Sequence, residues 1–140
     1  MIVSWRQLLR LLVALAMLLA LPLAEAAVRL LDRADLILAP GTTPPPESSA
    51  WKPVTLPDQW RQSRPHEMSD QGWYRIHVTL PADFNPLQAI YLPKVIMNAA
   101  VFVNGFPIGD GGSFEEPVAR NWNRPLMFLI PPGLLHPGDD

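Results

Sequence analysis

Apolar and polar residues alternate along the middle of the chain with the period of a β-strand. Residues 72–80 place Tyr74, Ile76, Val78 and Leu80 on one side of an extended chain and Trp73, Arg75, His77 and Thr79 on the other. Successive side chains of a strand point to opposite faces of its sheet. The pattern therefore predicts a strand with one buried face and one face that meets water or a ligand.

Three further segments also indicate strands. Residues 89–92 and 126–130 are continuous apolar runs, and their length and composition suit strands in the core of a sandwich better than helices. Residues 99–109 carry Asn104-Gly105 at their centre. A two-residue type I′ turn needs positive φ at both central positions, which Asn and Gly adopt at low energy, so this segment predicts a β-hairpin.

The remaining segments fit an all-β domain with long connections. Residues 27–50 form a lead-in, in which 28–38 is an opening strand or an irregular stretch and 39–49 is an extended, solvated loop rich in Pro, Ser and Thr. Residues 58–61 suit one short helical turn, and 110–123 is the longest polar excursion. The 17 prolines disfavour long helices, because each fixes φ and removes a backbone donor.

The first 26 residues have the pattern of an export signal. Arg6 and Arg10 precede the apolar run of residues 11–21, and Ala24-Glu25-Ala26 is an A-x-A cleavage site. A membrane-spanning anchor needs about 20 apolar residues, so a cleavable leader is favoured over a retained anchor. We therefore expect a signal peptide over residues 1–26 and a mature domain that is periplasmic or extracellular.

Composition narrows the function. Without the leader about 114 residues remain, which suits one domain. That mature part has nine basic and twelve acidic residues and no basic cluster, which argues against nucleic acid as a partner. No cysteine is present, so neither a disulfide framework nor a thiolate metal site is available.

No pattern in the chain indicates catalysis or a cofactor. His66, His77 and His136 lie far apart in the sequence without the spacing of metal ligands. Glu115 and Glu116 are adjacent and point apart in an extended chain, whereas the carboxyl pair of a glycosidase straddles a sugar. No serine lies in a nucleophile motif. We expect no catalytic residue, no metal ligand and no cofactor in this chain.

Binding of a small ligand is the better expectation. Trp122, Asn123 and Arg124, with the nearby Arg120, combine an apolar ring with planar hydrogen-bonding groups, which suits the apolar face and the hydroxyls of a sugar. Trp73 on the polar face of its strand is a further candidate. The alternatives are that Trp122 caps the core, that Arg124 pairs with a nearby glutamate, and that a neighbouring segment covers Trp73.

Four motifs in the second half of the chain occur together in one known family. They are W-x-x-V-x-L-P-x-x-W at 51–60, G-W-Y-R at 72–75, V-x-V-N-G-x-x-I-G at 101–109 and L-x-P-G at 135–138. Their combination resembles the galactose-binding-like jelly roll, in particular the sugar-binding domain of glycoside hydrolase family 2 and the extracytoplasmic domains of bacterial sensor histidine kinases. The resemblance implies a jelly-roll β-sandwich over residues 51–140.

The chain also departs from that family. In the hydrolase members an Asn that can touch the sugar occupies the position of Ile96, so this contact is not transferred. The family continues into a last core strand where this chain ends at Asp140, so the resemblance implies a sandwich that is incomplete at its C-terminus.

The resemblance implies a non-enzymatic sensor domain at the N-terminus of a membrane histidine kinase. Its partners would be a carbohydrate or another small ligand and the downstream transmembrane and signalling domains of the parent protein. The alternative is an accessory carbohydrate-binding domain of a secreted glycoside hydrolase. The segment after residue 140 separates the two, because apolar spans favour the sensor and alternating β and α units favour the hydrolase.

Overall fold

The chain forms two compact units, residues 1–30 and residues 31–140. The computed structural model describes residue 5 and residues 28–66, 69–122 and 124–138. Apart from Trp5, the predicted signal peptide over residues 1–26 lies outside the described residues, so it stays a prediction. The second unit contains all the strands described below.

The second unit is an all-β domain, as the sequence predicts. Its strands are β1 (Arg33–Ile37), β2 (Lys52–Thr55), β3 (Trp73–Arg75), β4 (Gln88–Leu92), β5 (Ala100–Val103), β6 (Phe106–Asp110) and β7 (Leu126–Ile130). Helical structure in this unit is limited, among the described residues, to α2 (Trp60–Ser63) and the short 3-10 turn η1 (Pro132–Leu134). The short turn expected after Pro57 corresponds to α2.

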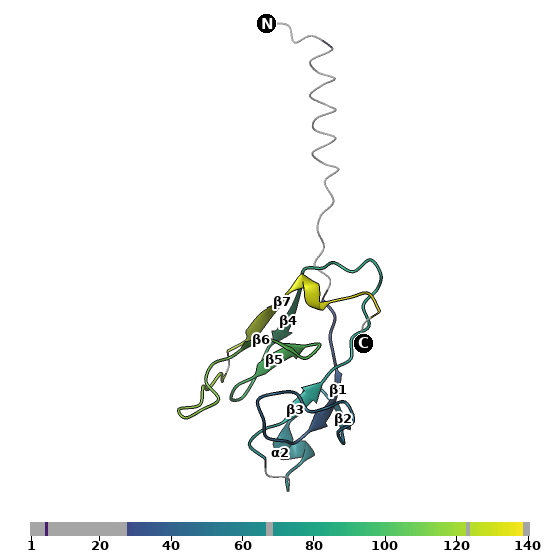
Figure 1. Cartoon of the computed structure of the whole chain (residues 1–140). Coiled ribbons are helices and arrows are strands. Elements are labelled where there is room, and N and C mark those ends of the chain that lie inside the picture. The colour runs from purple at the N-terminus through teal and green to yellow at the C-terminus, as the bar shows by residue number, and fades with distance from the viewer. Residues whose placement is uncertain (1–4, 6–27, 67–68, 123, 139–140) are drawn as a thin grey trace, which may run out of the picture. The chain divides into compact units, whose positions relative to one another are not determined.

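The strands form three small antiparallel sheets (Figure 1). Sheet A has the order β2-β1-β3, sheet B pairs β4 with β7, and sheet C is the β5-β6 hairpin. Of the two alternatives for residues 28–38, an opening strand or an irregular stretch, the structure shows a strand over Arg33–Ile37, and this β1 is the central strand of sheet A. The proline-rich segment that follows it contains neither helix nor strand over residues 39–49, as expected.

The predicted hairpin is confirmed at Asn104 and Gly105. Both residues have positive φ, 50° and 82°, which is the requirement of a type I′ turn. The Asn104 side chain also donates a hydrogen bond from Nδ2 to the backbone oxygen of Leu134, at 2.8 Å. Asn104 therefore both allows the turn conformation and links the turn to the segment around η1 by a hydrogen bond.

The core is formed by the central strand of sheet A and by β7. Its buried apolar residues are Ala34, Leu36, Leu126, Phe128 and Ile130. Sheet C packs on β7 where Gly109 faces the Phe128 ring, and a Cβ at Gly109 would lie 2.7 Å from Cδ1 of Phe128. Only glycine allows this close approach of the two sheets.

The prediction of one long strand over residues 72–80 is wrong in its length and in its buried face. The strand β3 contains only Trp73–Arg75. Tyr74 and Ile76, which the alternation placed on the buried face, are 38% and 39% exposed. On this face the Trp60 ring of the four-residue helix α2 lies close to Gly72, next to Leu36 of the central strand, and Tyr74 and Ile76 of the outer segment stay partly open.

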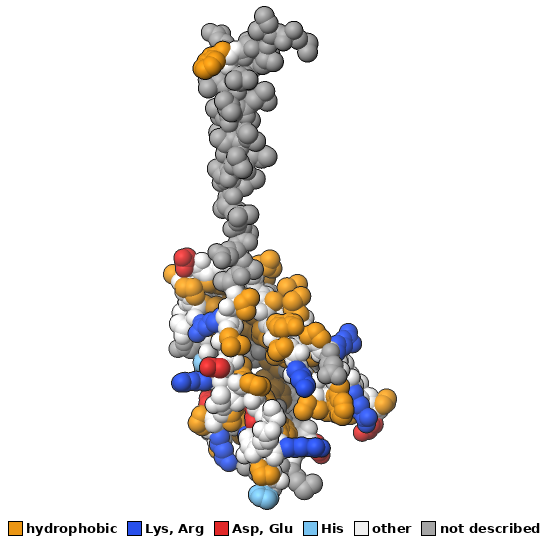
Figure 2. Space-filling model, turned by 180° about the vertical axis from the view of Figure 1, so that it is seen from behind, with side chains coloured by type: hydrophobic (Ala, Val, Ile, Leu, Met, Phe, Trp, Pro, Cys, Tyr) orange, Lys and Arg blue, Asp and Glu red, His pale blue; other side chains and the backbone are white. Residues whose placement is uncertain are grey.

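The two continuous apolar runs form strands, as predicted, but only one face of them is buried. Along β7, buried and exposed residues alternate, and Met127 and Leu129 are 67% and 64% exposed. Their partners in register are Tyr91 and Ala89 of β4, which are also exposed. Apolar side chains consequently gather on the outer face of sheet B, which is visible in Figure 2.

We predict that Asn104→Ala lowers the free energy of unfolding by about 2 kcal/mol, because alanine resists positive φ and cannot replace the hydrogen bond to Leu134. Thermal or urea unfolding of the full chain measures the change. Asn104→Gly is the matched control, since it relieves the backbone strain while removing the same hydrogen bond. Equal losses in both variants would contradict a contribution from the turn conformation.

Candidate ligand-binding site

One face of sheet A carries three rows of side chains that run across the strands. The pairing of Arg33 with Thr55 defines the first row, and the pairing of Asp35 with Pro53 and Arg75 defines the second. Continuing the β1-β3 register by two residues places His77 beside Arg33. The third row contains Ile37 and its partner Trp73. We call this surface the charged face of sheet A.

Arg75 lies across the charged face and holds three segments together. Its Nη2 donates to Oδ2 of Asp35 at 2.9 Å, and its Nη1 donates to Oε2 of Glu47 at 2.6 Å. The guanidinium carbon also lies 4.4 Å from the centre of the Trp51 ring. A cation over an indole face is attracted by the electron density of the ring. Arg75 therefore connects β3 with β1, with Trp51 just before β2, and with the proline-rich loop that contains Glu47.

The first two rows line an open trough of about 550 Å³. This volume falls within the range of small-molecule sites. The residues around it come from all three strands of sheet A and from the extended segment that follows β3. They are Arg33, Ala34, Asp35, Pro53, Val54, Thr55, Arg75 and His77.

Two donors of the trough are not used within the described part of the chain. Neither Arg33 nor His77 makes an ion pair or a side-chain hydrogen bond with another described residue. Arg75 differs from them, because two carboxylates already neutralise it. The trough thus combines a fixed, paired arginine with an arginine and a histidine that are available to a ligand.

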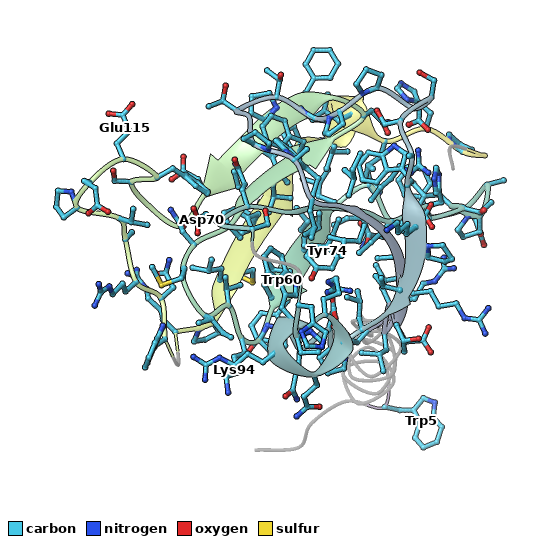
Figure 3. All side chains as sticks on the ribbon, turned by 90° about the horizontal axis from the view of Figure 1, so that it is seen from below. Trp5, Trp60, Asp70, Tyr74, Lys94 and Glu115 are labelled. Carbon is cyan, nitrogen blue, oxygen red and sulfur yellow. The ribbon has the colours of Figure 1, made fainter. Side chains whose placement is uncertain are left out.

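The opposite face of sheet A carries a hydrogen-bonded cluster around α2. Trp60 and Tyr74 point toward one another in Figure 3, and Nε1 of Trp60 donates to the Tyr74 hydroxyl at 2.5 Å. The hydroxyl donates in turn to Oδ2 of Asp58 at 2.7 Å. Asp58 also accepts hydrogen bonds from Ser63 and Arg64. This cluster fixes α2 on the sheet.

The two acidic groups of this cluster have shifted pKa values. Burial alone would raise the pKa of Asp58, but the hydrogen bonds from Tyr74, Ser63 and Arg64, together with the Arg64 charge, lower it below 3.8. Burial and the hydrogen bond to Asp58 raise the pKa of Tyr74 to about 12. The Asp58 carboxylate is 4% exposed and already accepts three donors. The Asp58 carboxylate therefore has a structural role, because its hydrogen bonds are made within the protein.

Of the predicted ligand-binding residues, Trp73 lies in the packing between sheets. Its ring contacts Phe102 of β5 at a centroid distance of 5.6 Å. Its Nε1 is buried and has no hydrogen-bond partner among the described residues. This geometry favours the alternative in which a neighbouring segment covers the Trp73 ring.

Arg120, Trp122 and Arg124 share the loop between β6 and β7, and all three are exposed, Trp122 by 67%. Asn123 lies outside the described residues. No ion pair joins Arg124 to Glu115 or Glu116 in the described part of the chain. The exposure of Trp122 does not fit a residue that caps the core.

Two asparagines that the motif analysis does not single out hold the base of this loop. Asn121, 3% exposed, is the buried polar residue of the described chain, and its Nδ2 donates to Oδ1 of Asn98 and to the Gly111 oxygen. Asn98 donates from its own Nδ2 to the oxygens of Gly112 and Ser113. No signal in the sequence separates these two amides from the other asparagines.

The charged face of sheet A is not predicted from the sequence. Arg33, Asp35 and Thr55 lie in segments expected to be a lead-in and part of the core, and they become neighbours only through the strand register. The one available signal was the placement of Arg75 and His77 on the polar side of residues 72–80.

The described residues contain no group of three His, Cys, Asp or Glu side chains that could hold a metal ion. Within the same residues, no helix has the length and apolar character needed to span a membrane. Comparison with protein-family models, with curated proteins and with solved structures finds no match for this chain.

We predict that alkaline pH destabilises the domain through Tyr74. A phenol whose pKa is raised from 10.0 to about 12 stabilises the fold fully below pH 10, and this contribution is lost as the pH rises toward 12. We expect a loss on the order of 1 kcal/mol, because water screens a partly exposed group. Urea unfolding between pH 9 and 12 measures it.

Tyr74→Phe should abolish the part of the alkaline decrease in unfolding free energy that the Tyr74 phenol causes. Tyr91→Phe, at an exposed tyrosine on sheet B, controls for the loss of one phenol elsewhere. Identical pH profiles for the Tyr74→Phe and wild-type chains would contradict the assignment.

Proposed function

We propose that this chain is a non-enzymatic ligand-recognition domain that works outside the cytoplasm, as the sensor part of a membrane histidine kinase. We further propose that it is a galactose-binding-like jelly roll. The observation that carries the recognition role is the open trough on sheet A, where Arg33 and His77 have no partner among the described residues. A small number of polar or charged groups that converge on a concave surface fix the orientation of a bound ligand and give the site its specificity.

The positions of the motif residues support the jelly-roll resemblance. Trp51 lies beneath the Arg75 guanidinium, Trp60 donates to Tyr74, and Asn104-Gly105 forms the hairpin turn. Residues from three of the four motifs thus have a defined structural task in the second unit. This is the pattern expected of residues that specify a fold.

A sensor must convert binding into a change of its attachment to the next domain. A ligand shifts a conformational equilibrium only when it binds one state more tightly than the other. A ligand in the trough contacts the row that contains Asp35 and Arg75, and Arg75 holds the proline-rich loop through Glu47. We propose that occupancy of the trough changes this link, and that the change reaches the transmembrane segment of the parent kinase.

The second candidate function is an accessory carbohydrate-binding domain of a secreted glycoside hydrolase. The exposure of Trp122 on a loop that also carries Arg120 and Arg124 favours it. An exposed indole stacks on the apolar face of a sugar, and guanidinium groups donate to its hydroxyls. In this alternative the ligand sits on the loop between β6 and β7 and leaves the trough empty.

We predict that the chain exports a reporter. Alkaline phosphatase fused after residue 140 should be active in a bacterial host, because this enzyme folds only outside the cytoplasm. Leu15→Arg together with Leu18→Arg breaks the apolar run of the leader and should abolish the activity while the fusion is still produced. Full phosphatase activity in the double variant would contradict an export signal over residues 1–26.

We predict for the second candidate that neutral sugars change the indole fluorescence through Trp122. Because the chain has five tryptophans, the signal is assigned by difference, with galactose titrated into the wild-type and Trp122→Ala chains. Trp122→Phe is the matched control, since it keeps an aromatic face. A flat signal in the wild-type chain would argue against a sugar site on this loop.

A further inference from the structure

We infer that the trough on sheet A binds a hydroxy acid, with the ligand carboxylate at Arg33 and His77 and a ligand hydroxyl at Asp35. This inference rests on the proposed recognition function and names its ligand class. It is carried by the arrangement of the first two rows on the charged face of sheet A.

Arg33 is the available carboxylate binder of the trough. Its guanidinium is always protonated and presents a planar fork of donors that matches the two oxygens of a carboxylate. Arg33 is exposed and makes no ion pair with another described residue. The other arginine of the trough, Arg75, is paired with Asp35 and Glu47.

The neighbours of Arg33 in its row add further donors. Thr55 is its partner in register on β2, and His77 follows β3 on the other side. Adjacent strands lie about 4.8 Å apart, so a carboxylate above Arg33 is within reach of the Thr55 hydroxyl and the His77 ring. The row therefore offers three donors to one anion.

The second row supplies a hydrogen-bond acceptor, the Asp35 carboxylate. Oδ2 of Asp35 accepts from Arg75, whereas Oδ1 accepts no hydrogen bond from a described residue. Because the Asp35 carboxylate is already paired with the Arg75 guanidinium, its Oδ1 suits a ligand hydroxyl better than a second cation. Rows on one face of a strand are about 6.8 Å apart, and the long Arg33 side chain spans much of that separation.

The size of the trough favours a sugar acid over a short hydroxy acid, because its volume of about 550 Å³ exceeds what a three-carbon acid fills. D-galacturonate, D-galactose and lactate therefore form an informative set of probes. Galactose differs from galacturonate by the missing carboxylate, and lactate keeps the carboxylate and hydroxyl without the ring.

Isothermal titration calorimetry of the full chain with these probes tests the inference. We expect galacturonate to bind at least about tenfold more tightly than galactose, and Arg33→Gln to weaken galacturonate binding by about tenfold or more. Arg33→Lys should recover part of the affinity, because lysine keeps the charge without the planar fork.

Lys52→Gln is the matched control variant. Lys52 lies in the same sheet and pairs with Leu36, so it belongs to the opposite face, and its removal deletes one positive charge at a comparable place. It should leave galacturonate binding unchanged. Equal losses in Lys52→Gln and Arg33→Gln would overturn the site, since they would reflect overall charge alone.

The remaining outcomes also decide the question. Lactate binding as tight as galacturonate binding supports the carboxylate site and assigns it to short hydroxy acids. If galactose binds as tightly as galacturonate, the inference is overturned. If Trp122→Ala then weakens galactose binding, the recognition function is kept but belongs to the loop between β6 and β7. If neither acid binds although thermal unfolding shows that all variants are folded, the inference is overturned. If galactose does not bind either, the result also contradicts the proposed function.

Discussion

The second unit depends on one interaction more than on any other, the placement of the Arg75 guanidinium across β1. It is surrounded by Asp35 of the central strand β1, Glu47 of the proline-rich loop and Trp51, the residue before the edge strand β2. Partly exposed ion pairs contribute at most about 1 kcal/mol each, so the value of this cluster is mainly positional. It fixes the proline-rich loop against the sheet, where no regular backbone pairing would hold it.

The Arg75 cluster lies on one of two different faces of sheet A. On one face, Ala34 and Leu36 are buried, and the Trp60 ring of α2 lies close to Gly72 beside Leu36. On the other face, the row of Ile37 and Trp73 packs toward Phe102, while the rows of Arg33 and Asp35 stay open. Polar side chains on an open face of an antiparallel sheet are ordinary. The trough is distinguished by the arginine and the histidine that find no partner there.

The sequence predicts local structure better than it predicts how strands meet. The Asn104-Gly105 turn, the apolar strand over residues 126–130 and the opening strand are all found, because turn chemistry and apolar composition act within a few residues. Alternation over residues 72–80 identifies which side chains share a face. It cannot show which face another layer covers, and that is decided by the distant residues Trp60 and Phe102.

The candidate site illustrates the same limit. Arg33 and Thr55 are separated by the whole proline-rich loop, and only the β1-β2 register makes them neighbours. Exposed loop residues such as Trp122 can be proposed from composition, because a large aromatic residue in a polar segment is conspicuous. A site made from alternate residues of three strands has no such local signature.

The two candidate surfaces differ in how they connect to the rest of the domain, and this difference bears on function. The loop that carries Trp122 is closed at its base by Asn98 and Asn121, so a ligand at its exposed part need not disturb the sheets. Such a surface suits simple attachment to a sugar. A ligand in the trough, by contrast, lies against Arg75, which ties β3 to β1 and to the proline-rich loop. A sensor requires that binding alter another part of the protein. Arg75 is itself part of the trough, whereas Asn98 and Asn121 lie at the base of the other loop and not at its exposed part.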